Sequence, residues 1–164
     1  MSSEPTFTIH LAKEDFKFSA AHFTLFPNGH AELLHGHNYR VRVRLAGRRL
    51  GEDGILVDVA RVKRRVRAAC AAWDERTLIP SETDRLSVTR DESGGVEIWF
   101  GERRYRVPEQ DVVLLPLQNV SMELLARRLW GEVAEELTGT AVDELTVEVE
   151  ETPGQSCEYR ARVD

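Results

Sequence analysis

One strand pattern constrains the fold more than any other feature of this sequence. Apolar side chains and arginines alternate strictly over seven residues: Tyr39, Arg40, Val41, Arg42, Val43, Arg44 and Leu45. Successive side chains of a strand point to opposite faces of its sheet, so a period of two indicates a strand that is buried on one face only. We therefore expect a sheet with one packed face and one solvated face.

Further strands are predicted near both ends of the chain. At the start, Phe7, Ile9 and Leu11 share one parity, and Phe16 and Phe18 lead into Ser19-Ala20-Ala21-His22. At the end, Leu145, Val147 and Val149 point one way, and Glu151 has the same parity. A carboxylate that continues an apolar face lies either at a fraying strand end or where it binds something, and the pattern alone leaves both possibilities open.

Two helices are predicted between these strands. The first follows Asp58, a good N-cap, and its apolar residues recur at helical spacing: Val59, Val62, Val66, Ala69 and Trp73. The second begins at Ser121, and Gly139 is suited to its C-terminal cap. Its apolar stripe consists of Leu125, Leu129, Val133 and Leu137.

The segment 86–116 between the helices has a different pattern. Short apolar stretches at Val88, at Val96 to Phe100 and at Tyr105 to Val107 are separated by glycine-containing turns, which is typical of a β-meander. We interpret it as an insertion into one domain that spans residues 1–164. The order of elements predicts an α+β fold with an antiparallel sheet.

The overall composition excludes several classes of protein. Hydrophobic residues make up 41% of the chain, which is enough for a core, and the formal net charge of −6 argues against a general nucleic-acid-binding protein. Two local basic stretches, Arg40–Arg44 and Arg61–Arg67, are either solvated faces of a strand and a helix or a cradle for a phosphorylated substrate.

Nothing in the sequence indicates secretion or a membrane span. Residues 1–14 are polar, so no signal-peptide core is expected, and no apolar run is long enough to cross a bilayer. Cys70 and Cys157 are too few for a disulfide framework. We expect both to be reduced thiols in a cytoplasmic protein.

The histidines suggest a metal site. Residues two apart in an extended segment project to the same face, so His35 and His37 can reach one ion, and antiparallel pairing would bring His22 beside them. Three imidazoles with an open fourth position are a ligand set of catalytic zinc. A His-x-His pair alone is weak evidence, because such pairs are more often ordinary surface or core residues. His30 is a spare ligand or a loop residue, and His10 is structural or exposed.

Five short motifs follow one another along the chain: Phe18-Ser19-Ala20-Ala21-His22, His35-Gly36-His37-Asn38-Tyr39, Gly54-Ile55-Leu56-Val57-Asp58, Asn119-Val120-Ser121-Met122-Glu123 and Glu151-Thr152. Together they resemble the 6-pyruvoyl-tetrahydropterin synthase and 6-carboxy-tetrahydropterin synthase family. The resemblance covers nearly the whole chain apart from the predicted meander.

This resemblance implies a fold, an assembly and a site. The family has the tunnelling fold, an antiparallel sheet with two helices on one face, and its trimers stack into a homohexamer with active sites between subunits. Its ligands for Zn²⁺ correspond to His22, His35 and His37. Its pterin-binding carboxylate corresponds to Glu151, followed by Thr152. A pterin ring presents paired N–H donors that a carboxylate can accept.

The chain departs from the family at its proton-transfer groups. The usual cysteine four residues before the His-Gly-His motif is replaced by Ala31, and the usual aspartate–histidine pair appears as Asp74-Glu75. Glu32, three residues before His35, resembles a paralogue class that cleaves the side chain of 7,8-dihydroneopterin triphosphate. The alternative for Glu32 is an ordinary loop carboxylate.

The resemblance therefore implies a zinc-dependent lyase that gives 6-hydroxymethyl-7,8-dihydropterin for folate synthesis, with Glu32, Asp74 and Glu75 as the candidate catalytic groups. A carboxylate base works best when burial raises its pKa toward neutrality. The alternatives are 6-carboxy-5,6,7,8-tetrahydropterin synthase on the queuosine route, 6-pyruvoyl-tetrahydropterin synthase, and a non-catalytic paralogue that binds zinc and pterin.

Overall fold

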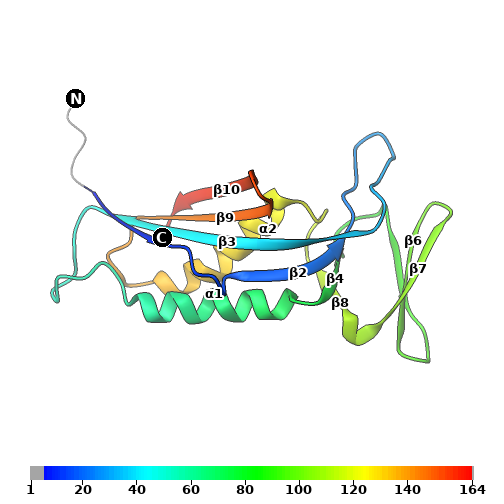
Figure 1. The fold of residues 1–164 in the computed structure, drawn as a ribbon, viewed down its shortest axis with the longest axis horizontal. Helices are drawn as coiled ribbons and strands as arrows, with labels where there is room; N and C mark the ends of the chain where they lie inside the picture. The colour runs from blue at the N-terminus through cyan, green and yellow to red at the C-terminus, as the bar shows by residue number, and fades with distance from the viewer. Residues whose placement is uncertain (1–5, 164) are drawn as a thin grey trace. The chain divides into compact units, whose positions relative to one another are not determined.

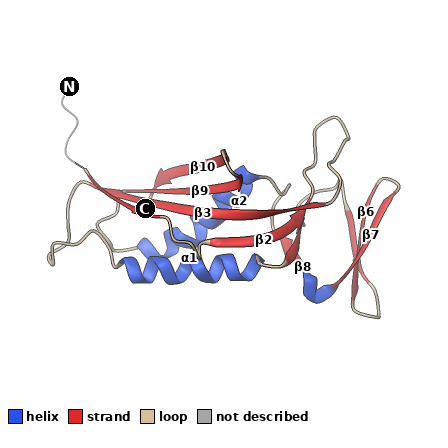
Figure 2. Ribbon diagram, viewed as in Figure 1, coloured by secondary structure: helices blue, strands red, loops and turns tan. Residues whose placement is uncertain are grey.

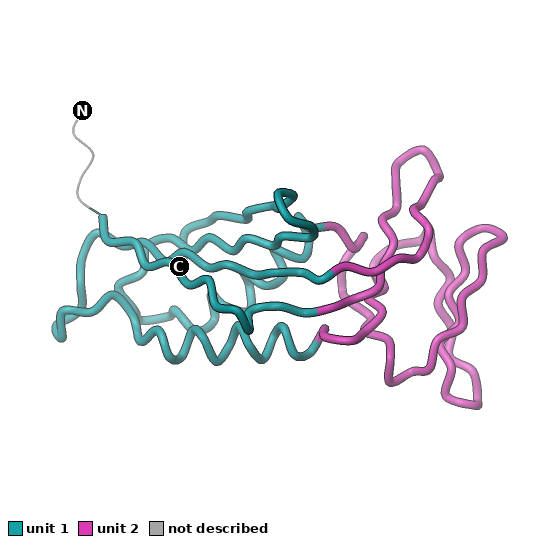
Figure 3. The backbone as a smooth tube through the Cα atoms, in the orientation of Figure 1, with its two compact units in different colours: residues 1–18, 38–72, 122–164 teal, residues 19–37, 73–121 magenta. Residues whose placement is uncertain are grey.

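The computed structural model describes residues 6–163, so the first five residues of the polar N-terminal segment, and Asp164, lie outside it. The described chain forms two compact units (Figure 3). Among the described residues, unit 1 contains residues 6–18, 38–72 and 122–163, and unit 2 contains residues 19–37 and 73–121. Two strands, β2 (Lys17–His22) and β3 (His35–Gly47), have residues in both.

The strands of unit 1 pair in an antiparallel manner. β3 pairs with β1 (Phe7–Leu11) and with β9 (Glu144–Thr152), and β9 pairs with β10 (Gln155–Arg162) (Figure 1). The apolar residues of β3 and β9 are at most 2% exposed: Val41, Val43, Leu45, Leu145, Val147 and Val149. Val41 lies opposite Val149, and Val43 lies opposite Val147. The predicted packed face is confirmed.

Two helices cover this face (Figure 2). α1 (Val59–Trp73) begins after Asp58, whose carboxylate accepts a hydrogen bond from the backbone N–H of Ala60 at 2.9 Å, as expected for an N-cap. α2 (Met122–Ala134) packs against β9 and β10 and continues as a short 3-10 helix, Glu135–Leu137. Gly139 follows with a φ of 76°. Arg65 of α1 joins the two helices through Glu132 and Glu135.

Unit 2 contains strands that the sequence did not indicate. β2 pairs in parallel with β4 (Arg76–Pro80), and β4 pairs in parallel with β8 (Val112–Leu115). The sheet is therefore mostly antiparallel with a parallel part. β8 lies within the range 86–116 that we predicted for the insertion, but it pairs with β4 and not with the strands of the predicted meander. The prediction of an α+β fold with two helices is confirmed.

The predicted meander is present in unit 2. β5 (Ser87–Arg90), β6 (Gly95–Phe100) and β7 (Arg103–Pro108) form a separate antiparallel sheet, followed by a 3-10 turn, Glu109–Asp111. Val96 and Ile98 of β6 belong to a buried cluster that also contains Phe23, Leu25, Ile79 and Leu86. The meander thus shares a core with the segment that follows β2.

Candidate metal centre

Three histidines come together in unit 2. His22 is the last residue of β2, and His35 and His37 lie at the start of β3. The ring centroid of His22 lies 4.8 Å from that of His35 and 5.4 Å from that of His37. A Cβ on Gly36 would lie 3.5 Å from the carbonyl oxygen of Ala20, an ordinary contact, so this position does not require glycine on steric grounds.

Backbone carbonyls orient two of the three rings. Nδ1 of His22 lies 3.1 Å from the carbonyl oxygen of Val120, and Nδ1 of His35 lies 2.7 Å from that of Leu33. A carbonyl can only accept, so each Nδ1 carries a proton and donates it. In the neutral ring, Nε2 then presents a lone pair, which is the form in which histidine binds a metal ion.

The arrangement suits one shared cation. One ring nitrogen from each histidine lies within 4.8 Å of the others. Nε2 of His35 and Nε2 of His37 are 2.9 Å apart, a separation that needs a shared proton or a shared cation because two lone pairs repel. Two nitrogens in a tetrahedral zinc site lie about 3.3 Å apart, given Zn–N bonds of about 2.0–2.1 Å. The group can therefore bind a metal ion and leave a fourth position open.

Glu32 is held beside this group by a short hairpin, residues 24–32. Oε2 of Glu32 accepts a hydrogen bond from the backbone N–H of Thr24 at 2.9 Å, and its own N–H donates to the carbonyl of Thr24 at 3.0 Å. Leu25 and Ala31 form a β-bridge within the hairpin. Thr24 is two residues beyond His22, so the carboxylate is anchored next to the end of β2.

The electrostatics of Glu32 differ from the expectation. Burial raises its pKa, but hydrogen bonds from Thr24 and, when the rings are protonated, the charges of His35 and His22 lower it by more, so the pKa lies below its ordinary value. The direction is opposite to the one that would suit a carboxylate base best. The influence of the two imidazoles also places the carboxylate in the electrostatic field of the histidine group.

One asparagine connects the hairpin to the support of His22. Oδ1 of Asn119 accepts hydrogen bonds from the N–H groups of Leu25 and Val120, and its Nδ2 donates to the carbonyl of Leu25 at 2.9 Å. The carbonyl of Val120 is the partner of His22. Sequence reasoning found Asn119 only as part of a motif and assigned it no role.

Asp74 and Glu75 follow α1 and contact Ser19 of β2. Oδ1 of Asp74 accepts a hydrogen bond from the N–H of Ser19 at 2.7 Å, and the N–H of Glu75 donates to the carbonyl of Ser19 at 2.7 Å. Both side chains are exposed, and Glu75 has a φ of 57°, which is uncommon outside glycine. The pair thus lies in the turn between α1 and β4 and contacts the middle of β2, whereas His22 is the last residue of that strand and His35 and His37 belong to β3.

The carboxylate of Glu151 is well fixed within unit 1. The hydroxyl of Tyr39 donates to Oε1 at 3.1 Å, and the side-chain amide of Gln155 donates to Oε2 at 3.1 Å. Tyr39 is fully buried and stacks on Phe18 at 4.8 Å between ring centroids. Glu151 and Thr152 are the last two residues of β9, and the two hydrogen bonds to the Glu151 carboxylate favour an ordered strand end over a fraying one.

The arginine stretches mainly contact carboxylates of the chain itself. Arg42 pairs with Glu148 and Glu150 on β9, and Arg44 pairs with Glu158 on β10. In α1, Arg61 and Arg67 pair with Glu136 and Asp15. These contacts favour solvated faces over a phosphate cradle.

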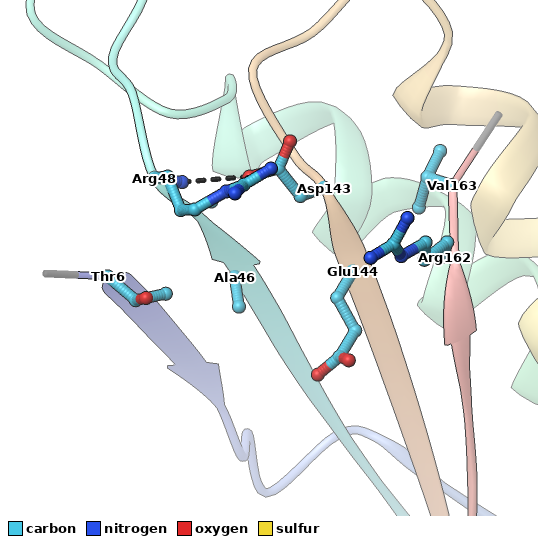
Figure 4. A pocket seen from close by; sticks show the side chains of 8 residues that line it. Thr6, Ala46, Arg48, Asp143, Glu144, Arg162 and Val163 are labelled. Carbon is cyan, nitrogen blue, oxygen red and sulfur yellow. Dashed lines mark hydrogen bonds and ion pairs between the residues drawn. The ribbon is translucent and has the colours of Figure 1, made fainter. Parts of the chain in front are cut away.

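A pocket of about 470 Å³ lies in unit 1 near the end of β3 (Figure 4). Arg48 and Asp143, which both line it, contact each other, with 3.5 Å between Nε and Oδ2. Glu144 and Arg162 also line it. None of the candidate site residues does.

No helix among the described residues is both long enough and apolar enough to cross a membrane. Both cysteines are thiols in the structure.

Comparisons with known proteins point to one family. The model of a family described as 6-pyruvoyl tetrahydropterin synthase matches residues 10–162. A Methanocaldococcus jannaschii protein, named a putative 6-carboxy-5,6,7,8-tetrahydropterin synthase, is 28% identical over 148 residues, which cover 88% of this chain and 89% of that protein.

A solved structure agrees. The crystal structure of 6-pyruvoyl tetrahydropterin synthase from Plasmodium vivax superposes with a TM-score of 0.89 at 28% identity and covers 97% of this chain and 99% of its own. A variant of that enzyme, in which a glutamate described as a catalytic residue is replaced by alanine, superposes equally well with a TM-score of 0.89. The chain therefore belongs to the 6-pyruvoyl tetrahydropterin synthase family, whose members are lyases of pterin side chains.

Proposed function

We propose that this protein is a zinc-dependent lyase that cleaves the side chain of 7,8-dihydroneopterin triphosphate and releases 6-hydroxymethyl-7,8-dihydropterin for folate synthesis. The observation that carries the proposal is the position of Glu32, anchored to Thr24 and within the field of His22 and His35. The similar Plasmodium vivax enzyme also has a glutamate that is described as catalytic.

The proposed reaction is a retro-aldol cleavage. A base removes the proton of the 2′-hydroxyl, the bond between C1′ and C2′ breaks, and C2′ leaves as an aldehyde that keeps the triphosphate. The electron pair remains on C1′, where the neighbouring C=N bond of the dihydropterin ring delocalises it. A proton returned to C1′ then completes the hydroxymethyl group.

The residues of this chain divide these tasks. His22, His35 and His37 would hold Zn²⁺, which supplies a Lewis acid for the side-chain oxygens. Glu32 is the base for the hydroxyl proton, and its low pKa keeps it ionised at neutral pH. Asp74 or Glu75 returns a proton to carbon. Glu151, with Thr152, binds the N–H donors of the pterin ring.

The test is product analysis by chromatography after incubation of the zinc-loaded protein with 7,8-dihydroneopterin triphosphate. The proposal predicts 6-hydroxymethyl-7,8-dihydropterin. Glu32→Gln should lose at least about 100-fold in kcat, since general acid–base catalysis contributes roughly 10²–10⁴, and should retain its zinc. Glu92→Gln, on an exposed turn of the meander, is the matched control. Full activity of Glu32→Gln would refute the role of this carboxylate.

A second candidate function has support from the relatives. Four relatives that are 26–28% identical are named putative or probable 6-carboxy-5,6,7,8-tetrahydropterin synthases. On that reading the same assay gives a carboxy product, and a pyruvoyl product would indicate the third activity of this family. Absence of any product, with zinc and pterin bound, would indicate a non-catalytic paralogue.

We further propose that the protein is a cytoplasmic homohexamer, a dimer of trimers with active sites between subunits. Light scattering coupled to size-exclusion chromatography tests the assembly. The expected mass is six times the 18.6 kDa of one chain. A monomer at micromolar concentration would contradict this assembly.

A further inference from the structure

The inserted meander contacts the backbone of the Glu32 hairpin through one arginine. Arg103, the first residue of β7, donates from Nη1 to the carbonyl oxygen of Glu32 at 2.6 Å and from Nη2 to that of Ala31 at 2.9 Å. The side chain is half-buried, and its guanidinium lies 4.8 Å from the ring centroid of Phe100. Two donors of one planar guanidinium on adjacent carbonyls fix both the distance and the direction of this part of the hairpin.

A second arginine holds the tip of the same hairpin. Nη2 of Arg85, which lies just before β5, donates to the carbonyl of Phe26 and, at 3.3 Å, to that of His30. Within the hairpin, the N–H of Phe26 donates to the carbonyl of His30 at 2.8 Å. The hairpin is therefore held from outside at both its base and its tip.

Apolar packing adds to this contact. Leu25 of the hairpin belongs to the same buried cluster as Val96 and Ile98 of the meander, and Ala31 and Leu34 pack against that cluster. The hairpin itself is short, with a single β-bridge, and an isolated two-stranded hairpin is only marginally stable in water. Its conformation therefore depends on the surface on which it lies.

We infer that the meander positions the candidate base, and that Arg103 is the positioning residue that connects the two. Arg103 does not touch the reacting groups. It fixes the carbonyls of Ala31 and Glu32, and therefore the position of the Glu32 Cα between them. The carboxylate then remains at Thr24 beside the histidines. This inference rests on the proposed role of Glu32, and it gives the insertion a function within the active site.

Arginine suits this position better than lysine would. A guanidinium presents several donors in one plane and can bind two carbonyls together, whereas an ammonium is a point donor without a fixed fork. Arg103→Lys should therefore keep the charge and part of the binding but lose the alignment, and its properties should fall between those of the parent protein and Arg103→Ala.

The test compares Arg103→Ala and Arg103→Lys with Arg104→Ala in the zinc-loaded full-length protein. Arg104 is the next residue of β7 and contacts Glu97 and Trp99, both within the meander. Four quantities are measured: kcat, KM, zinc content, and the rate of amide hydrogen exchange in residues 24–32 and 95–108.

For Arg103→Ala we expect faster exchange in residues 24–32 by about tenfold or more, because two charge-assisted hydrogen bonds are lost. We expect a fall in kcat of about the same size, with KM and zinc content little changed and residues 95–108 still protected. Arg104→Ala should match the parent in residues 24–32 and in kcat.

Two results would overturn the inference. One is unchanged exchange in residues 24–32 of Arg103→Ala. The other is a loss of protection across residues 95–108 in that variant, which would assign Arg103 a purely structural role in the meander. If the parent protein converts no pterin, the proposed function fails, and hydrogen exchange alone still decides whether Arg103 fixes the hairpin.

Discussion

Asn119 offers the sharpest test of how the site is held together. Its side chain satisfies both backbone groups of Leu25 and the N–H of Val120, with distances between 2.9 and 3.0 Å. Leu25 is only 3% exposed, so water cannot easily replace the lost partners. In Asn119→Ala, an unsatisfied N–H and an unsatisfied carbonyl remain on Leu25. Each costs about 1–3 kcal/mol, so the expected loss in the free energy of unfolding is roughly 2–6 kcal/mol.

An isosteric change separates hydrogen bonding from packing. Asn119→Asp keeps the two bonds that Oδ1 accepts and loses the one that Nδ2 donates, and it places a carboxylate oxygen against the carbonyl of Leu25. We expect this variant to lose about 2 kcal/mol or more, close to the alanine variant. Because Val120 also supports His22, zinc affinity should fall by roughly 10–100-fold in both variants.

Urea unfolding of the metal-free protein, at pH 7 and a fixed chain concentration, measures the loss in the free energy of unfolding. Competitive zinc titration measures the fall in zinc affinity. Gln118→Ala, a change at an exposed neighbour, is the control and should stay within about 0.5 kcal/mol of the parent. The reasoning would be refuted if both Asn119 variants unfolded within that same margin.

Two further predictions concern the scaffold. In Gly47→Ala, the new Cβ would lie 2.3 Å from the carbonyl oxygen of Ala141 and 2.5 Å from Cδ1 of Leu56, so we expect a loss of about 3 kcal/mol or failure to fold, measured by thermal unfolding. In the meander, a hydrogen bond from Arg106 holds the pKa of Asp91 well below its ordinary value of 3.8. The stability that Asp91 contributes is therefore complete above that value and declines as the pH falls below it. Asp91→Asn should be less stable than the parent at pH 6, and the difference should shrink at pH 2; an equal difference at both pH values in urea unfolding would contradict this.

Local patterns predicted a large part of the fold. The alternation around Val43, the N-cap at Asp58 and the position of Gly139 each reflect short-range geometry, and the structure has all three where the sequence indicated them. The meander strands were likewise evident from their turns. The three histidines that can share a cation were found because two of them lie two residues apart on one strand.

The missed strands lacked such patterns. β4 and β8 are short apolar runs without alternation, and parallel pairing between distant segments has no signal in one sequence. β10 alternates, but between half-buried residues such as Cys157 and Tyr159 and charged ones, so its apolar content was too low to stand out.

The contacts that hold the site in place also could not be predicted from local sequence patterns. Arg103 lies 71 positions from Glu32 and binds a carbonyl, which every residue possesses, so no residue type at position 32 could reveal the contact. The lowered pKa of Glu32 likewise depends on contacts that the sequence alone does not show. Burial raises this pKa, and only the hydrogen bonds from Thr24 and the charges of the histidines, when protonated, reverse the shift.

The central claim is that His22, His35 and His37 bind one zinc ion and leave a position for substrate. Zinc titration of chelator-treated protein, followed by X-ray absorption at the zinc edge, measures this directly. The account predicts one zinc per chain, three nitrogen ligands at about 2.0–2.1 Å and one further light ligand, with binding weakened in each single alanine variant of the three histidines. A protein that binds no zinc, or that binds it equally well after all three histidines are replaced, would contradict the account.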